Sequence, residues 1–132
     1  MRFAVRALDE VPQVPGADLD WHPLQHFFGL TAFGANLFVA RDEGDELIVA
    51  HDESESGQEE LYLVLRGRAR FALDGEEHEV AALGIVAVPE PTVRREATAL
   101  EPGAMVLALG GPPTEFQSTW QPSWFESVPK LH

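Results

Sequence analysis

The sequence contains no cysteine. Disulfide bonds, thiol nucleophiles and zinc sites with cysteine ligands are therefore excluded. Basic residues are also scarce, with nine lysines and arginines against 22 aspartates and glutamates, which gives a formal net charge of −13. This charge repels phosphate backbones and anionic lipid surfaces, so we expect neither a nucleic-acid partner nor a membrane partner.

Long apolar runs are missing as well. None approaches the roughly 20 residues that a membrane-spanning helix needs. The N-terminal stretch MRFAVRALDEVPQVPG has acidic residues and prolines where a secretory signal would have its apolar core. We therefore expect a cytoplasmic protein. At 132 residues, 45% of them hydrophobic, the chain is long enough for one domain with a single core.

What the sequence does contain is a series of short apolar segments separated by turn residues. Ten prolines and eleven glycines punctuate the chain, and this spacing disfavours long helices. Asp74-Gly75 supplies the positive φ angles of a tight turn, so its flanking segments should pair as an antiparallel hairpin. The pattern predicts an all-β sandwich or barrel. Its segments of strand length are 35–40, 46–50, 60–65, 68–74, 78–83, 84–89, 94–100 and 104–109.

The two ends of the chain lack this pattern. For residues 1–33 we predict an irregular N-terminal extension that packs on a barrel formed by residues 34–111. Residues 112–132 form a C-terminal tail that carries Trp120, Trp124 and Phe125. Aromatic rings on a terminal tail pack either on their own domain or on a second subunit, and both alternatives stay open.

The segment 60–65 places a carboxylate on a strand with two largely apolar faces. Alternation puts Glu60, Tyr62 and Val64 on one face and three leucines on the other. An unpaired carboxylate in such surroundings would cost several kcal/mol. Glu60 therefore needs a partner, and that partner bears directly on function.

The barrel region resembles the cupin superfamily. The end of the first cupin motif, G-x5-H-x-H-x3,4-E-x6-G, matches Glu60 and Gly67, and His51 aligns with its first histidine. Gly84 and Pro89 align with the start of the second motif, G-x5-P-x-G-x2-H-x3-N. The resemblance implies a single cupin-type β-barrel, that is, a jelly-roll-like double-stranded β-helix. It also implies association as a homodimer.

The metal-binding positions of the two motifs are only partly kept. Glu53 stands at the place of the second histidine, and Arg94 falls on the histidine position of the second motif. A guanidinium has no free lone pair and cannot ligate a cation. Its planar fork does suit a carboxylate such as Glu60. Motif counting favours Arg94 as the arginine that enters the lumen, but strand register decides between Arg94 and Arg95.

The function that this substitution favours is binding of a small polar or acidic molecule in the barrel, without a metal. Its expected ligand-binding residues are Glu60, Tyr62, Arg94 and His78. The His78 side chain shares a strand face with Val80, so it either contacts the ligand or only caps the mouth of the barrel.

Two other functions stay open. In the first, His51, Glu53 and Glu60 hold one divalent transition metal in an enzyme that resembles cupin dioxygenases or isomerases. The alternative for His51 is a histidine at a loop edge, bonded to backbone or water. The second is a non-catalytic interaction module that uses the aromatic tail as its contact surface.

Overall fold

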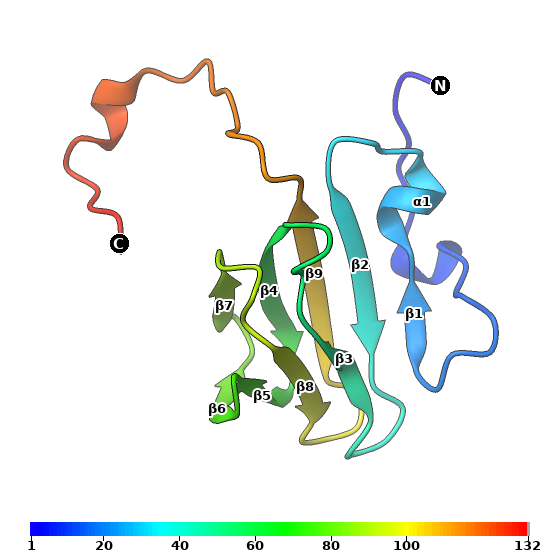
Figure 1. The fold of residues 1–132 in the computed structure, drawn as a ribbon. Coiled ribbons are helices and arrows are strands. Elements are labelled where there is room, and N and C mark those ends of the chain that lie inside the picture. Colours follow the sequence, from blue (N-terminus) through cyan, green and yellow to red (C-terminus); the bar gives the residue numbers. More distant parts are fainter. Residues whose placement is uncertain (132) are drawn as a thin grey trace.

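The computed structural model of the chain describes residues 1–131 (Figure 1). Within this range, nine strands form two antiparallel sheets of five and four strands. The strands are β1 (Asp20–His22), β2 (Gly34–Val39), β3 (Glu46–His51), β4 (Glu59–Arg66), β5 (Arg68–Leu73), β6 (Glu76–Ala81), β7 (Ile85–Val88), β8 (Arg95–Ala99) and β9 (Met105–Gly111). The predicted all-β fold is confirmed.

The order of strands within each sheet departs from the order in the chain. One sheet runs β1-β2-β9-β4-β7 and the other β3-β8-β5-β6. Consecutive strands therefore often belong to opposite sheets, as in a jelly roll. The predicted hairpin joins β5 and β6, where Leu73 pairs with Glu76 across Asp74 and Gly75. Both turn residues have positive φ, 51° and 83°, as this tight turn requires.

The core lies between the two sheets. Alternate residues of β4, β5 and β9 point inward, because successive side chains of a strand face opposite ways. Tyr62, Val64, Phe71 and Val106 are completely or almost completely buried there. The Tyr62 and Phe71 rings meet with centroids 5.7 Å apart, so the phenol is held by packing from the opposite sheet.

The N-terminal segment contains a strand that the sequence did not predict. β1 pairs with β2 as the edge of the five-stranded sheet, with Trp21 opposite Phe38. A strand of three residues is too short to produce a visible alternation. The same segment holds the helix α1 (Leu24–Phe28), which contacts β2, and a 3-10 turn, η1 (Leu8–Glu10). No helix in residues 1–131 is both long enough and apolar enough to span a bilayer.

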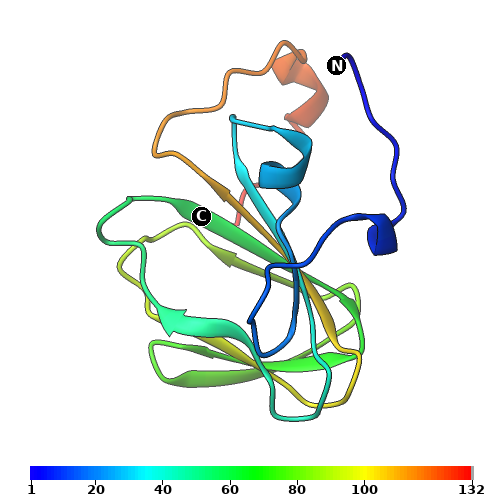
Figure 2. The same cartoon turned by 90° about the vertical axis from the view of Figure 1, so that its right-hand side faces the viewer.

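The C-terminal tail leaves the barrel after β9. Residues 112–131 are exposed throughout, including the 3-10 turn η2 (Pro122–Phe125). The tail arches away from the sheets (Figures 1 and 2). Trp120 and Phe125 stack on each other, with ring centroids 6.0 Å apart, and both remain largely exposed. In this structure the tail rings are therefore not packed on their own barrel.

Candidate functional site

A cavity of about 690 Å³ opens between the two sheets. One wall comes from β1, β2, β4 and β9, and the other from β3, with the segment 17–19 at the side. Its side chains combine aromatic rings with carboxylates and one imidazole. They include Trp21, Asn36, Phe38, His51, Glu60 and Tyr62. The volume lies within the range of small-molecule sites in proteins, about 300–1,000 Å³.

Glu60 is the polar centre of this cavity. It is the second residue of β4, and its side chain is 12% exposed. Its Oε1 accepts a hydrogen bond from Tyr62 Oη at 2.8 Å and a charge-assisted one from Arg95 Nη1 at 2.7 Å. The Arg95 side chain is fully buried, so this ion pair is shielded from water. The partner that Glu60 was expected to need is therefore present.

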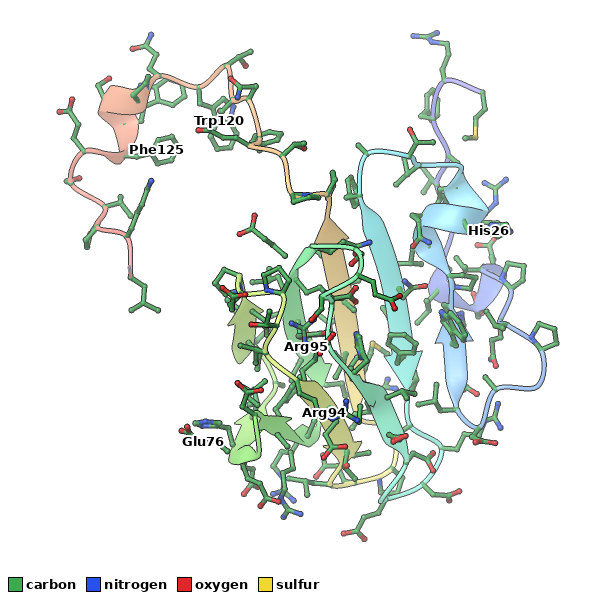
Figure 3. All side chains as sticks on the ribbon, in the orientation of Figure 1. His26, Glu76, Arg94, Arg95, Trp120 and Phe125 are labelled. Atoms are coloured by element: carbon green, nitrogen blue, oxygen red, sulfur yellow. The ribbon has the colours of Figure 1, made fainter. Side chains whose placement is uncertain are left out.

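The lumen-facing arginine is Arg95, and the prediction of Arg94 is wrong. Arg94 is exposed just before β8, where its backbone N–H donates to Asp74 Oδ1. Arg95, labelled with Arg94 in Figure 3, opens β8. Its alternate neighbours Ala97 and Ala99 are also completely or almost completely buried. The inward face of β8 thus consists of its odd-numbered positions. The alternation of small Ala97 and Ala99 with polar Glu96 and Thr98 is a signal in the sequence that the motif count does not use.

His51 ends β3 and lies beside the ion pair. Its Nδ1 is 2.6 Å from the carbonyl oxygen of Val49, and its Nε2 is 3.1 Å from Glu53 Oε1 and 3.5 Å from Glu60 Oε1. Both nitrogens thus face acceptors. The ring can donate to both only as an imidazolium. In that state His51 and Arg95 balance the charges of Glu53 and Glu60.

Two groups in this network have displaced pKa values. Burial raises the pKa of Glu53, but the hydrogen bond from Ser56 and the charge and hydrogen bond of His51 outweigh it and hold the pKa below its usual range. Ser56 Oγ donates to Glu53 Oε2 at 2.6 Å. Burial, followed by the negative charge of Glu60, raises the pKa of Tyr62 far above that of a free phenol. Tyr62 is therefore a neutral hydrogen-bond donor at all ordinary pH values.

His78, which we predicted to contact the ligand or to cap the mouth of the barrel, does not line the cavity. It sits on β6, the edge strand of its sheet, with about half of its side chain exposed. Its Nε2 is 3.0 Å from Glu76 Oε1. It does share a face with the half-buried Val80, as alternation requires, but no further strand follows β6 to enclose it.

The predicted metal-ligand group does come together. His51, Glu53 and Glu60 each offer one ligand atom, and these atoms all lie within 4.8 Å of one another. The chemistry of the group fits a divalent cation poorly, however. Glu60 Oε1 is already bonded to Arg95 and Tyr62, and the buried guanidinium would repel a second positive charge at this short range.

Sequence reasoning missed the aromatic wall of the cavity. Trp21 lies in the short strand β1, within a region expected to be irregular. Its Nε1 donates to Asn36 Oδ1 at 2.8 Å, and its ring centroid is 5.8 Å from that of Phe38. The indole is thus fixed in place by β2. Only the placement of β1 against β2 reveals this wall.

The charges at the cavity are mostly acidic. Asp18, Asp45 and Glu46 contribute to its lining in addition to Glu60. Asp45 is already occupied, since its Oδ2 accepts the backbone N–H groups of Arg41 and Asp42. Among the described residues that line the cavity, no lysine or arginine is present. The expectation of an acidic ligand depended on Arg94, and it loses its support because Arg94 does not line the cavity.

Comparisons with known proteins identify the fold. No protein-family model matches the chain, and no curated protein matches it. A cupin protein from Bacteroides fragilis superimposes with a TM-score of 0.66 at 18% identity, over 92% of this chain and 98% of its own. KdgF from Halomonas sp. gives a TM-score of 0.62 at 20% identity, over 76% and 85% of the two chains.

A cupin-superfamily sugar phosphate isomerase from Silicibacter pomeroyi is also similar. Its TM-score is 0.61 at 21% identity, over 71% of this chain and 59% of its own. A Streptomyces protein, PAC13, solved with uridine, gives 0.60 at 14% identity, over 83% and 82%. Identities this low carry the fold and no activity. The chain has the cupin fold, as its motifs had indicated.

Proposed function

We propose that this protein binds a small, uncharged polar molecule in its cavity and does so without a resident metal. The observation that carries the proposal is the fully buried Arg95 guanidinium, 2.7 Å from the carboxylate of Glu60. It supplies the positive charge that a cation would otherwise bring to Glu60. The cavity then offers a polar end of Glu60, Tyr62 and His51.

The remainder of the cavity supports the choice of an uncharged ligand with a flat face. Trp21 and Phe38 form an aromatic wall, and such rings pack well against sugar or nucleobase rings. Hydroxyl or N–H groups of the ligand would donate to Glu60, which has lone pairs left after its two protein donors. A phosphate or carboxylate would face the acidic lining, and no lysine or arginine among the described lining residues would neutralise it.

Matched ligands that differ only in charge test this proposal. Uridine is compared with uridine monophosphate, and glucose with glucose 6-phosphate, by thermal shift and calorimetry. A ligand that binds the folded state raises the melting temperature by mass action. We expect the uncharged member of a pair to bind more tightly. A larger stabilisation by the phosphorylated members would contradict the proposal.

The variant Glu60→Gln, with Glu59→Gln as its control, locates the site. Both residues lie on β4, but Glu59 is exposed and Glu60 lines the cavity. We expect Glu60→Gln to weaken binding by one to two orders of magnitude, because loss of a charged acceptor costs about 1.5–3 kcal/mol. Glu59→Gln should leave the affinity unchanged. Equal effects of the two variants would place the ligand elsewhere.

A second candidate function is that of a metal-dependent enzyme. The convergence of His51, Glu53 and Glu60 within 4.8 Å is the observation that favours it. A cation held there would act as a Lewis acid. One equivalent of metal in protein purified without a chelator or histidine tag, and its loss in His51→Ala, would put this function first. Metal-free protein that does not take up zinc or manganese supports the metal-independent site.

A further inference from the structure

Asn36 is the only asparagine of the chain, and it lies within strand β2. Asparagine is uncommon inside strands, so its presence here calls for a reason other than strand formation. Asn36 and Phe38 are two residues apart on β2, so both side chains lie on the core side of the five-stranded sheet. Both line the cavity, and Asn36 is only partly buried there. Its amide group is therefore accessible to a ligand.

A neighbouring indole fixes the orientation of this amide. Trp21 lies opposite Phe38 in the register of β1 and β2, and its Nε1 contacts Asn36 diagonally at 2.8 Å. An indole N–H can only donate a hydrogen bond, so the amide atom that it contacts is the oxygen Oδ1. The Nδ2 group, with its two N–H donors, then points away from the indole. Among residues 1–131, no protein group accepts a hydrogen bond from Nδ2.

Asn36 Nδ2 is thus a free side-chain donor in a cavity whose other donors are engaged. The indole N–H donates to Asn36, and the phenol of Tyr62 donates to Glu60. Both ring nitrogens of His51 face oxygen atoms of the protein. The remaining polar side chains of the described lining are carboxylates, which accept hydrogen bonds when they are ionised. The lining therefore has several side-chain acceptors and one free side-chain donor.

We propose that Asn36 determines the specificity of the cavity by selecting a ligand whose flat ring carries a carbonyl group, as in a cyclic amide. This inference rests on the proposed binding of an uncharged molecule. The ring would lie against Trp21 and Phe38, and its carbonyl oxygen would accept from Asn36 Nδ2. N–H or hydroxyl groups of the ligand would donate to Glu60. The backbones of β2 and β4 are about 10 Å apart, because only β9 separates them, so one substituted ring can contact both side chains.

Uridine and cytidine are matched probes of this selection, because an amino group of cytidine replaces a ring carbonyl of uridine. Calorimetry should find that uridine binds at least about 10-fold more tightly, since the amino group would place a donor against the Asn36 donor. Asn36→Asp keeps the acceptor for the indole and exchanges the free donor for an acceptor. The preference should then change in favour of cytidine. Tighter binding of cytidine by the unmodified protein would contradict the inference.

The control for this variant is Gln25→Glu, which makes the same change from amide to carboxylate outside the cavity. Gln25 lies on α1, and its Oε1 accepts the backbone N–H of Ala35 at 2.7 Å. It does not line the cavity, so Gln25→Glu should leave the ratio of the two affinities unchanged. A shift of the ratio as large as that in Asn36→Asp would show that the added charge, and not the lost donor, causes the effect.

A second variant tests the role of the indole in orienting the amide. Trp21→Phe keeps an aromatic ring in the wall but removes the N–H that holds Asn36 Oδ1. The amide can then turn over, so the affinities for uridine and cytidine should become nearly equal. Circular dichroism checks that each variant is folded, and either variant is sufficient if the other does not fold. An unchanged ratio of affinities in the folded variants would overturn the inference.

Glucose separates this inference from the proposed function, because it is uncharged but has no flat ring with a carbonyl group. Binding of glucose and of neither nucleoside would refute the role of Asn36 and leave the proposed function standing. No binding of any of the three molecules would count against both. Binding of uridine with a ratio to cytidine that does not depend on Asn36 would refute the role of Asn36 alone.

Discussion

Replacing Arg95 with methionine removes the guanidinium that contacts Glu60 while keeping most of the apolar stem that fills the core. Glu60 would then be a largely buried carboxylate that retains only the Tyr62 hydroxyl and the more distant His51. Breaking a buried ion pair on one side costs about 3–5 kcal/mol. Because Glu60 is 12% exposed and keeps one donor, we expect a loss near the lower end of that range.

The neighbouring Arg94 provides the control for this variant. Arg94 is exposed, so Arg94→Met should change the free energy of unfolding by no more than about 0.5 kcal/mol. A loss of about 3 kcal/mol corresponds to a melting temperature roughly 10 °C lower for a domain of this size. Urea unfolding of both variants, with unchanged m-values, measures the difference.

A double variant separates the ion pair from simple packing. In Arg95→Met/Glu60→Gln the uncompensated charge is gone, so the double variant should be more stable than Arg95→Met alone. The reasoning is refuted if Arg95→Met costs less than about 1 kcal/mol, or if Arg94→Met is the more damaging change. Either result would mean that Arg95 is not the buried partner of Glu60.

Three further predictions concern single residues. Tyr62 is the only tyrosine, and burial and the Glu60 charge raise its pKa. The contribution of the neutral phenol to the stability of the fold is therefore complete below pH 10.0 and is lost as the pH rises further. Phenolate absorbance should consequently appear only when the protein unfolds in alkali. Because the pKa of Glu53 is lowered, its ionised carboxylate stabilises the fold above pH 4.5, and this stabilisation is lost in stronger acid. In Glu53→Gln, the free energy of unfolding should therefore fall less steeply as the pH is lowered. Gly84→Ala should destabilise the fold by about 1–3 kcal/mol in urea unfolding, because a Cβ at this position would lie 2.4 Å from Val80 Cγ1. Gly111→Ala is the control, since its Cβ would meet no atom within 4 Å and its stability should be unchanged.

The fold could be predicted because its signals are local. Strand-length segments, the Asp74-Gly75 turn and the spacing of Glu60, Gly67 and Gly84 each report on a few neighbouring residues, and β2–β9 follow from them. β1 could not be predicted, since three residues are held in the sheet by pairing with β2 and not by their own pattern. The sequence pattern therefore did not predict that Trp21 lines the cavity.

The site was predicted in part, and the error on the arginine has a clear cause. Shifting the strand by one residue exchanges its two faces. β8 itself pairs regularly with β5 and alternates without interruption from Arg95 to Ala99. The motif count ran from Pro89 to Arg94 through the connection between β7 and β8, where no strand alternation fixes which residue enters the inward face. The small side chains of Ala97 and Ala99 fit the crowded inner face, and they indicate correctly that Arg95 shares it.

The charge balance of the site connects these observations. When both nitrogens of His51 donate, its charge and that of Arg95 equal the charges of Glu53 and Glu60, and the cluster is then balanced without a ligand. Adding a divalent cation, even with a neutral His51, would leave an excess positive charge in a largely buried place. Adding an anion would set it against the acidic lining of the cavity. An uncharged ligand disturbs neither balance, and it gains the aromatic wall as well as the free acceptor sites of Glu60.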